Sequence, residues 1–219
     1  MSAEGPARVV FFDKDGTLLA DVPWNVDPVR MRLAPGAAAG LPLLAAQGYR
    51  VAVVSNQPGV ARGLFPEGAL ILVERRLRAL LGQLGVALEG FYYCPHDPGG
   101  TVAAYRRDCE CRKPAPGLLY RAACDMGITP DRAWFVGDIL DDVEAGCAAG
   151  CRTVLIDNGN ETEWRLSPVR LPHHVASDLE EAARAILAHD LARDAFGCGL
   201  RNARRAARPE HAAATGRHA

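Results

Sequence analysis

The chain has 219 residues, of which 49% are hydrophobic and 23% are charged, and its formal net charge is -1. This composition is typical of a globular chain with a buried core, and the charge gives no reason to expect a nucleic-acid or membrane partner. Seven cysteines in a chain of this length argue against a disulfide scaffold. The N-terminal residues lack the apolar core of a signal peptide and no run of about 18 apolar residues occurs, so a reducing, cytoplasmic compartment is expected.

The first predicted strand covers residues 9–12, an apolar run typical of a buried strand. It ends at Asp13 and Asp15, which are followed by Gly16 and Thr17. Because residues i and i+2 of an extended chain project the same way, both carboxylates should face one point beyond the strand. A bound cation would offset their repulsion at the edge where open α/β sheets bind ligands. The alternative is a turn that carries a solvated acid pair.

This stretch, Asp13-x-Asp15-Gly16-Thr17, resembles the first motif of the haloacid-dehalogenase-like (HAD) phosphohydrolases. A proline-rich loop over 19–35, a helix over 36–47 and a strand over 50–54 are expected next. Strand, helix and strand form a βαβ unit, which implies a parallel sheet. In the loop, Trp24 either forms a wall that contacts substrate or docks on the core as part of a connector.

The second strand ends at a polar loop that reads Ser55-Asn56-Gln57-Pro58-Gly59-Val60-Ala61-Arg62-Gly63. This loop resembles that of a HAD subgroup containing the heptose bisphosphate phosphatases and the histidinol-phosphate phosphatases. The resemblance implies that Ser55 hydrogen-bonds the transferring phosphoryl group and that Asn56 and Gln57 contact the substrate. Arg62 either contacts a second anionic group or closes the loop as a surface residue.

A helix over 66–84 and a strand over 90–93 lead to two close pairs of metal-ligand residues, which are Cys94 with His96 and Cys109 with Cys111. Three thiols and one imidazole fit a tetrahedral Zn2+ site. The loop between the pairs has little core material and would hardly hold its shape without a bound metal, which favours this site. Four protein ligands leave no open position, so the expected zinc is structural. A redox pair and buried free thiols are the alternatives.

The zinc-site sequence and the residues after it carry the most specific resemblance, in Tyr93-Cys94-Pro95-His96 and Cys109-x-Cys111-Arg112-Lys113-Pro114-x-Pro116-Gly117. They resemble the zinc loop of the D-glycero-D-manno-heptose 1,7-bisphosphate phosphatases and their histidinol-phosphate relatives, and the resemblance extends over about 9–156. It implies that Lys113 stabilises the nucleophile and the phosphoryl charge, and that Arg112 helps to recognise the substrate. A cation is needed there because the attacked phosphate is an anion.

A helix over 117–126 and a strand over 133–136 precede a second acidic motif, Gly137-Asp138-Ile139-Leu140-Asp141-Asp142. It resembles the fourth HAD motif, which implies that Asp138 ligates Mg2+ and that Asp142, alone or with Asp141, acts in its outer sphere. The alternative for these last two acids is that they cap the next helix. Ile139 stands where heptose phosphatases often carry a basic residue, which weakens the substrate assignment more than the reaction type.

The remaining expected elements are a helix over 142–149, a strand over 152–156, an edge strand over 174–175 and a helix over 179–187. The predicted fold is α/β, a Rossmann-like doubly wound parallel sheet (the HAD fold) over 1–192 with a zinc loop at 94–111. Residues 193–219 are Arg/Ala-rich and are expected to form a disordered tail. The gap between Thr17 and Gly36 is too short for a helical cap, so a capless, open site is expected.

The resemblance thus implies a Mg2+-dependent phosphomonoesterase in which Asp13 forms an aspartyl-phosphate and Asp15 is the general acid and base. Mg2+ would be held by Asp13, the Asp15 backbone carbonyl and Asp138. The expected substrate is D-glycero-D-manno-heptose 1,7-bisphosphate, which would lose its 7-phosphate, and histidinol phosphate or another small sugar phosphate is the alternative. A zinc-stabilised binding protein on a phosphatase scaffold is the non-enzyme alternative. A monomer is expected.

Overall fold

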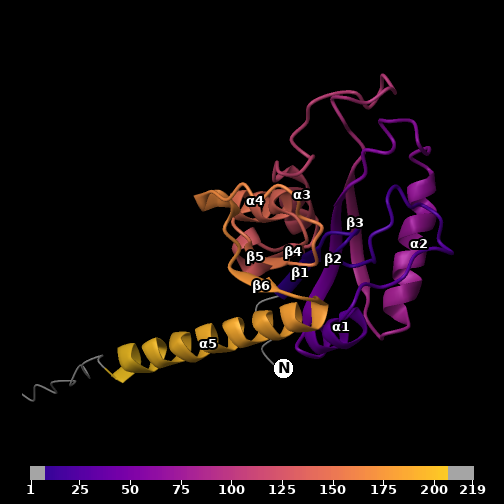
Figure 1. Cartoon of the computed structure of the whole chain (residues 1–219). Coiled ribbons are helices and arrows are strands. Elements are labelled where there is room, and N and C mark those ends of the chain that lie inside the picture. Colours follow the sequence, from indigo (N-terminus) through magenta and orange to yellow (C-terminus); the bar gives the residue numbers. More distant parts are fainter. Residues whose placement is uncertain (1–7, 207–219) are drawn as a thin grey trace, which may run out of the picture. The chain divides into compact units, whose positions relative to one another are not determined.

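A six-stranded parallel sheet forms the centre of the protein, with the strand order β3-β2-β1-β4-β5-β6 (Figure 1). The computed structural model describes residues 8–206, with side chains described as far as residue 195. The strands are β1 (Arg8–Phe12), β2 (Tyr49–Asn56), β3 (Leu88–Cys94), β4 (Ala133–Gly137), β5 (Arg152–Ile156) and β6 (His174–Ala176). The prediction of a doubly wound parallel sheet is confirmed.

Helices cover both faces of this sheet. They are α1 (Ala37–Ala46), α2 (Ala69–Gly82), α3 (Gly117–Asp125), α4 (Leu140–Ala149) and α5 (Leu179–Ala206), with short 3-10 turns η1 (Pro130–Arg132) and η2 (Pro168–Arg170). The crossovers through α1 and α2 move the chain from β1 out to β3, and those through α3 and α4 move it back past β1. Because parallel crossovers are right-handed, the two pairs of helices lie on opposite faces of the sheet.

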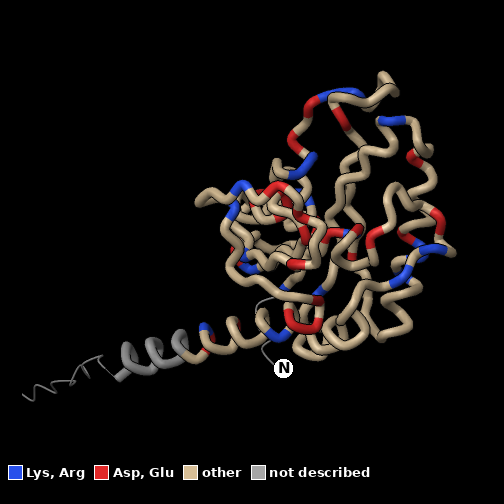
Figure 2. The backbone as a smooth tube through the Cα atoms, viewed as in Figure 1, with Lys and Arg blue, Asp and Glu red and all other residues tan. Residues whose placement is uncertain are grey.

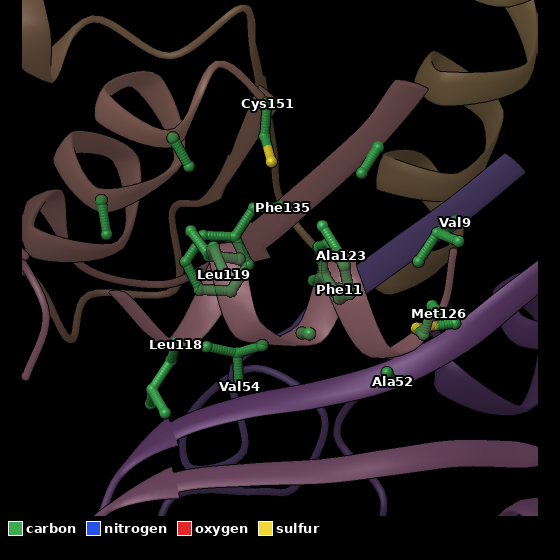
Figure 3. Packing of buried hydrophobic residues seen from close by; sticks show 14 of the residues in the cluster. Val9, Phe11, Ala52, Val54, Leu118, Leu119, Ala123, Met126, Phe135 and Cys151 are labelled. Atoms are coloured by element: carbon green, nitrogen blue, oxygen red, sulfur yellow. The ribbon is translucent and has the colours of Figure 1, made fainter. Parts of the chain in front are cut away.

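The core follows from the alternation of side chains along β1, where Val9, Val10, Phe11 and Phe12 are all buried. Val9 and Phe11 belong to a cluster with α3, whose apolar side chains cover the strands in Figure 3. Val10 and Phe12 point to the other face. Both faces of β1 are therefore covered, which accounts for the unbroken apolar run in its sequence.

The sheet has its topological switch point at β1, which pairs with β2 on one side and with β4 on the other. The crossovers leave β1 and β4 in opposite directions, so a crevice opens at the carboxyl ends of these strands. This edge carries both acidic motifs and Ser55.

The segment between β1 and α1 contains no helix, and it folds back on itself through an isolated antiparallel bridge between Leu19 and Leu33. No cap domain is inserted there, as the short gap predicted. Figure 2 shows acidic and basic positions interspersed over the described residues, as expected from the near-zero net charge. Local groups, and not a global field, therefore set the charge at the crevice.

Some boundaries differ from expectation. Helix α2 begins at Ala69, after a turn at Pro66, and α4 begins at Leu140. The largest difference concerns α5, which was expected to end at residue 187 and to give way to an irregular tail from residue 193. In the structure α5 continues to Ala206, and the Ala, Arg and Leu residues of this stretch favour a helix although Gly197 and Gly199 oppose it.

Residues 207–219 of the expected tail lie outside the described residues. The chain divides into two compact units after Ala185, so the sheet, α1–α4 and the start of α5 form the first unit. Within residues 8–206, no helix is long and apolar enough to cross a membrane.

Candidate active site

The candidate site is built from three buried groups at the carboxyl ends of neighbouring strands, namely Asp13 after β1, Ser55 as the penultimate residue of β2 and Asp138 after β4. The backbone N–H of Asp13 donates to the carbonyl of Val136 at 2.9 Å. This bond continues the β1–β4 pairing one residue past the end of β1. Asp13 is therefore held by the sheet itself and not by a loose loop.

A buried lysine bridges the acids of the two motifs. The Lys113 Nζ lies 2.6 Å from Asp13 Oδ1 and 2.5 Å from Asp142 Oδ1, and it donates to the carbonyl of Val54 at 3.2 Å. Burial lowers the pKa of Lys113, but the charges of Asp13 and Asp142 outweigh it and raise the pKa above its ordinary value. Lys113 is thus a cation beside the first carboxylate.

The backbone of Lys113 is clamped by the side-chain amide of Asn56. The Asn56 Nδ2 donates to the Lys113 carbonyl at 3.0 Å, and its Oδ1 accepts from the Lys113 N–H at 3.0 Å. This reciprocal pair ties the loop after the cysteine cluster to the end of β2. Asn56, which the sequence placed in contact with substrate, also lines the cavity described below, and its amide positions Lys113.

Asp138 is held by one hydrogen bond to each carboxylate oxygen. Thr17 Oγ1 donates to its Oδ1 and Asn160 Nδ2 donates to its Oδ2, both at 2.8 Å. Gly16 allows this approach, because a Cβ at that position would lie 2.1 Å from Asp138 Oδ2 and its φ is +76°. The glycine of the first motif therefore leaves room for the acid of the fourth.

Three carboxylates converge on one point, since ligand oxygens of Asp13, Asp138 and Asp142 lie within 4.8 Å of one another. Burial, together with repulsion from Asp13, raises the pKa of Asp138 to about 6. Burial likewise raises the pKa of Asp142 to about 7, although Lys113 opposes this. Three acids share a single lysine, and hard oxygen donors are what Mg2+ prefers, so the residues present fit this ion.

Asp15 lies at the mouth of the same crevice, half-buried. It accepts from Lys14 Nζ at 2.7 Å and from Gln57 Nε2 at 3.1 Å. Desolvation raises its pKa, and Lys14 partly offsets that effect. Gln57 Nε2 also donates to Ser55 Oγ at 3.0 Å, so one amide fixes both the hydroxyl and the second acid. Asp15 can therefore exchange a proton with a molecule bound in front of Asp13.

Most of these groups line a cavity of about 460 Å³, although Ser55 and Asp142 are not among its lining residues. Its floor includes Asp13, Asp15, Asp138 and Lys113, and Arg112 adds a second cation to the lining. The apolar part of the lining consists of Val22, Pro23, Trp24, Pro58, Phe65 and Ile139, and Asp21, Asp141 and Asn160 also line the cavity. A charged floor beneath an apolar wall suits an anion that carries an organic leaving group.

The cysteine and histidine residues form a second cluster, whose four ligand atoms lie within 4.8 Å of one another. The Sγ of Cys111 lies 3.0 Å from that of Cys94 and 3.3 Å from that of Cys109, which is much longer than a disulfide bond of about 2.05 Å. The His96 Nδ1 is 3.2 Å from Cys111 Sγ. Burial and the nearby Arg107 lower the pKa of His96, which favours the neutral imidazole that a metal requires. The donor set fits Zn2+.

The two expected substrate contacts Arg62 and Trp24 differ in their position relative to the cavity. Trp24 lines the cavity, whereas Arg62 is not among its lining residues. The Arg62 guanidinium instead lies 4.9 Å from the Trp24 ring centroid, and its Nε donates to Asp97 Oδ2 at 2.6 Å. Arg112, which lines the cavity, also donates to the carbonyl of His96 at 3.2 Å.

The sequence reasoning missed the loop after β5. Asn158 Nδ2 donates to the Gly16 carbonyl at 2.7 Å, Asn160 holds Asp138, and Glu161 accepts from the Leu140 N–H at 2.7 Å at the start of α4. The signal that could have identified this loop is its position at the carboxyl end of a fifth parallel strand, where side chains meet the site.

Asp141, which we considered for the outer metal sphere, forms an ion pair with Arg170 at 2.5 Å and lines the cavity. Asp142 instead faces inward, where it approaches the Ile139 N–H at 3.4 Å and pairs with Lys113. The two adjacent acids therefore differ in their surroundings.

Comparisons with known proteins identify the family of the chain. Residues 110–182 match the family model described as HAD-hydrolase-like. The D-glycero-beta-D-manno-heptose-1,7-bisphosphate 7-phosphatase of Pasteurella multocida is 37% identical over 153 residues, which cover 69% of this chain and 83% of that protein. The enzyme of the same name from Rhodopseudomonas palustris is 38% identical over 151 residues, 68% of this chain and 84% of that protein.

Two solved structures also resemble the chain. A putative HAD-like phosphatase from Mesorhizobium loti matches with a TM-score of 0.71 and 31% identity, over 82% of this chain and 86% of that one. The D,D-heptose 1,7-bisphosphate phosphatase of B. bronchiseptica, complexed with magnesium and phosphate, matches with a TM-score of 0.68 and 27% identity, over 83% of this chain and 99% of that one.

The fold and these relatives show that the chain belongs to the HAD-like hydrolases. Within that class it is a phosphatase, a hydrolase of phosphoric monoesters.

Proposed function

We propose that the chain removes the 7-phosphate of D-glycero-D-manno-heptose 1,7-bisphosphate with the help of Mg2+. The observation that carries the reaction is the buried pair of Asp13 and Lys113, 2.6 Å apart, with Asp15 two residues further on. The substrate is supported by the names of the curated relatives, of which this chain covers four fifths or more of the length in the two cases described.

In this mechanism Asp13 attacks the phosphorus atom and forms an aspartyl-phosphate, while the bond to the C7 oxygen breaks. This divides one difficult displacement into two easier ones. Lys113 Nζ holds Asp13 Oδ1 and orients the carboxylate, and its charge offsets the negative charge on the phosphoryl oxygens. Ser55 Oγ, fixed by Gln57, donates to a phosphoryl oxygen.

Asp15 gives its proton to the departing alkoxide and then takes a proton from the water that cleaves the aspartyl-phosphate. Its raised pKa favours the protonated form that the first step needs. Gln57 and Lys14, which both donate to Asp15, fix the direction of its carboxyl group.

The carboxylates of Asp13 and Asp138 and the backbone carbonyl of Asp15 would hold Mg2+, with Asp142 in the outer sphere. When bound, Mg2+ would neutralise charge on the phosphoryl oxygens. Thr17 and Asn160 keep Asp138 in place for this role. The other proposed metal is a structural Zn2+ held by Cys94, His96, Cys109 and Cys111, with no open position for chemistry.

Arg112 is the cation proposed to recognise the phosphate that stays on the sugar. It lines the cavity beside Lys113, and its bond to the His96 carbonyl ties it to the cysteine and histidine cluster. Ile139 adds no charge to the wall, so a second phosphate would depend mainly on Arg112. All of these groups come from one chain, and we propose that a monomer is active.

The test is phosphate release by the purified protein with Mg2+ from both anomers of the heptose bisphosphate, histidinol phosphate and simple sugar monophosphates. We expect one heptose anomer to reach a kcat/KM of about 10^4 M-1s-1 or more. Asp13→Asn is the control, and it should abolish turnover while the protein stays folded and keeps its zinc. A preference for histidinol phosphate would rule out the heptose bisphosphate as the substrate. An active Asp13→Asn variant would rule out the proposed mechanism.

A further inference from the structure

Trp24 stands out on the wall of the cavity because its backbone is in the left-handed region, with φ at 58°. It is the one non-glycine residue with positive φ among the described residues. A bulky aromatic side chain is uncommon in this conformation, and it persists only where the surroundings hold it. The indole is nevertheless 47% exposed, so its own burial does not hold it in place.

The support for the indole comes from Arg62. The guanidinium lies 4.9 Å from the ring centroid, and Arg62 is absent from the cavity lining that includes Trp24. Arg62 thus contacts the ring without belonging to the cavity lining, and the exposed part of Trp24 is free to contact a bound molecule. A guanidinium over an indole is a favourable cation–π arrangement.

Asp97 fixes the guanidinium. Its Oδ2 accepts from Arg62 Nε at 2.6 Å, and its Oδ1 accepts from the Gly99 N–H at 3.0 Å. Asp97 is buried, and its Oδ2 forms an ion pair with Arg62 Nε at 2.6 Å. Asp97 follows His96 directly in the chain, within the segment 94–111 that carries the cysteine and histidine cluster.

This segment also docks on the loop that carries Arg62. The N–H groups of Thr101 and Val102 donate to the Ala61 carbonyl at 2.8 and 2.9 Å, and Thr101 Oγ1 donates to the Arg62 carbonyl at 3.1 Å. Gly100 permits the contact, because a Cβ there would lie 2.6 Å from the Ala61 oxygen. Backbone and side chain of Arg62 are thus both held by segment 94–111.

We propose that the cavity-facing surface of Trp24 is the platform on which the sugar ring of the substrate stacks, and that Asp97 positions this platform through Arg62. The C–H face of a sugar is apolar and suits an indole, which offers a large rigid surface at a low cost in conformational entropy. In this arrangement Arg62 does not bind a substrate phosphate, since Asp97 already satisfies its charge. Segment 94–111 therefore contributes to substrate affinity and not to the chemical step.

The inference rests on the proposed sugar-phosphate activity, and the experiment separates the two. Steady-state rates are measured for the heptose bisphosphate and for glycerol 2-phosphate, an acyclic phosphomonoester that has no ring to stack. Trp24→Ala should raise KM for the heptose bisphosphate about tenfold with little change in kcat, and Trp24→Tyr should recover most of the loss. Asp97→Asn should raise the same KM about threefold.

Binding is followed without turnover by titrating the heptose bisphosphate into Asp13→Asn and recording tryptophan fluorescence. We expect a change in emission that is lost when Trp24→Phe is added to Asp13→Asn. Glu74→Ala breaks an exposed ion pair with Arg78 on α2 and is the matched control for a surface charge. Melting temperature and zinc content of every variant identify those that have lost their fold or their metal.

If Trp24→Ala lost kcat/KM equally for the cyclic and the acyclic substrate, or lowered kcat alone, the proposed stacking of the sugar on Trp24 would be wrong. An unchanged fluorescence response without Trp24 would also overturn it. If the wild-type protein hydrolyses glycerol 2-phosphate but not the heptose bisphosphate, the proposed substrate fails, and the same comparison is then made with the best cyclic sugar phosphate of the panel.

Discussion

Replacing Asn56 by alanine tests how the site holds Lys113. The Asn56 amide makes two hydrogen bonds of 3.0 Å to the backbone of Lys113, and Lys113 is 3% exposed, so water cannot easily replace them. Each such bond contributes about 0.5–1.5 kcal/mol net, so the loss of both should destabilise the protein by about 1–3 kcal/mol. For a chain of this length, that lowers the Tm by about 2–4 °C for each kcal/mol.

The effect on turnover should exceed the effect on stability. Lys113 Nζ must stay within hydrogen-bond distance of Asp13, and a shift of about 1 Å in a catalytic group can reduce the rate about 100-fold. We therefore expect Asn56→Ala to lower kcat by at least about tenfold, with a smaller change in KM.

The assay is steady-state phosphate release from glycerol 2-phosphate with saturating Mg2+, together with thermal unfolding. Gln83→Ala removes an exposed amide after α2, far from this clamp in the chain, and should leave both readouts unchanged. An Asn56→Ala variant with wild-type kcat and wild-type Tm would refute the role of the clamp.

Three further predictions concern the metals. Burial raises the pKa of Asp138 to about 6 and of Asp142 to about 7, so the metal-free native state holds protons that the unfolded chain has released. Its stability should therefore fall as pH rises from about 4 to 7. The Tm gain on adding Mg2+ should accordingly be larger at a pH of about 7.5 than at about 5.5, and equal gains would contradict this. Cys109→Ser should release zinc and lower the Tm by more than about 5 °C, whereas Cys124→Ser, at an exposed thiol, should do neither. Gly16→Ala would bring a Cβ within 2.1 Å of Asp138 and should reduce kcat at least about 100-fold, and normal Mg2+ activation of this variant would disprove the packing argument.

The parts of the fold that the sequence predicted are those with a local signal. Residues 9–12 form a continuous apolar run and residues 152–156 end in one at 154–156, and both segments form largely buried strands that keep nearly the expected bounds. Because parallel strands place their carboxyl ends at one edge, the sequence also predicted that Asp13, Ser55 and Asp138 meet there. The roles given to these residues stay predictions until they are measured.

What the sequence could not predict depends on contacts between distant segments. The polar loop of Asn158 and Asn160 has no periodicity, and only its fold-back onto Gly16 and Asp138 shows its use. Arg62 has the expected place in the sequence, yet a partner in another loop, Asp97, draws its charge away from the cavity. Helix α5 shows the reverse case, in which an Arg/Ala-rich composition was interpreted as a disordered tail although Ala and Arg favour a helix.

The contacts that assemble the site also bear on when activity appears during folding. Lys113 and Asp13 are 100 residues apart, Thr17 and Asp138 are 121 apart, and Asn158 reaches Gly16 across 142 residues. Each contact closes a loop whose entropy must be lost before the contact can form. Helices and the first strand pair can form earlier, because their partners are near in the chain. Recovery of phosphatase activity after dilution from denaturant should therefore lag behind recovery of the helical circular dichroism signal. Activity then measures the last contacts to form during folding.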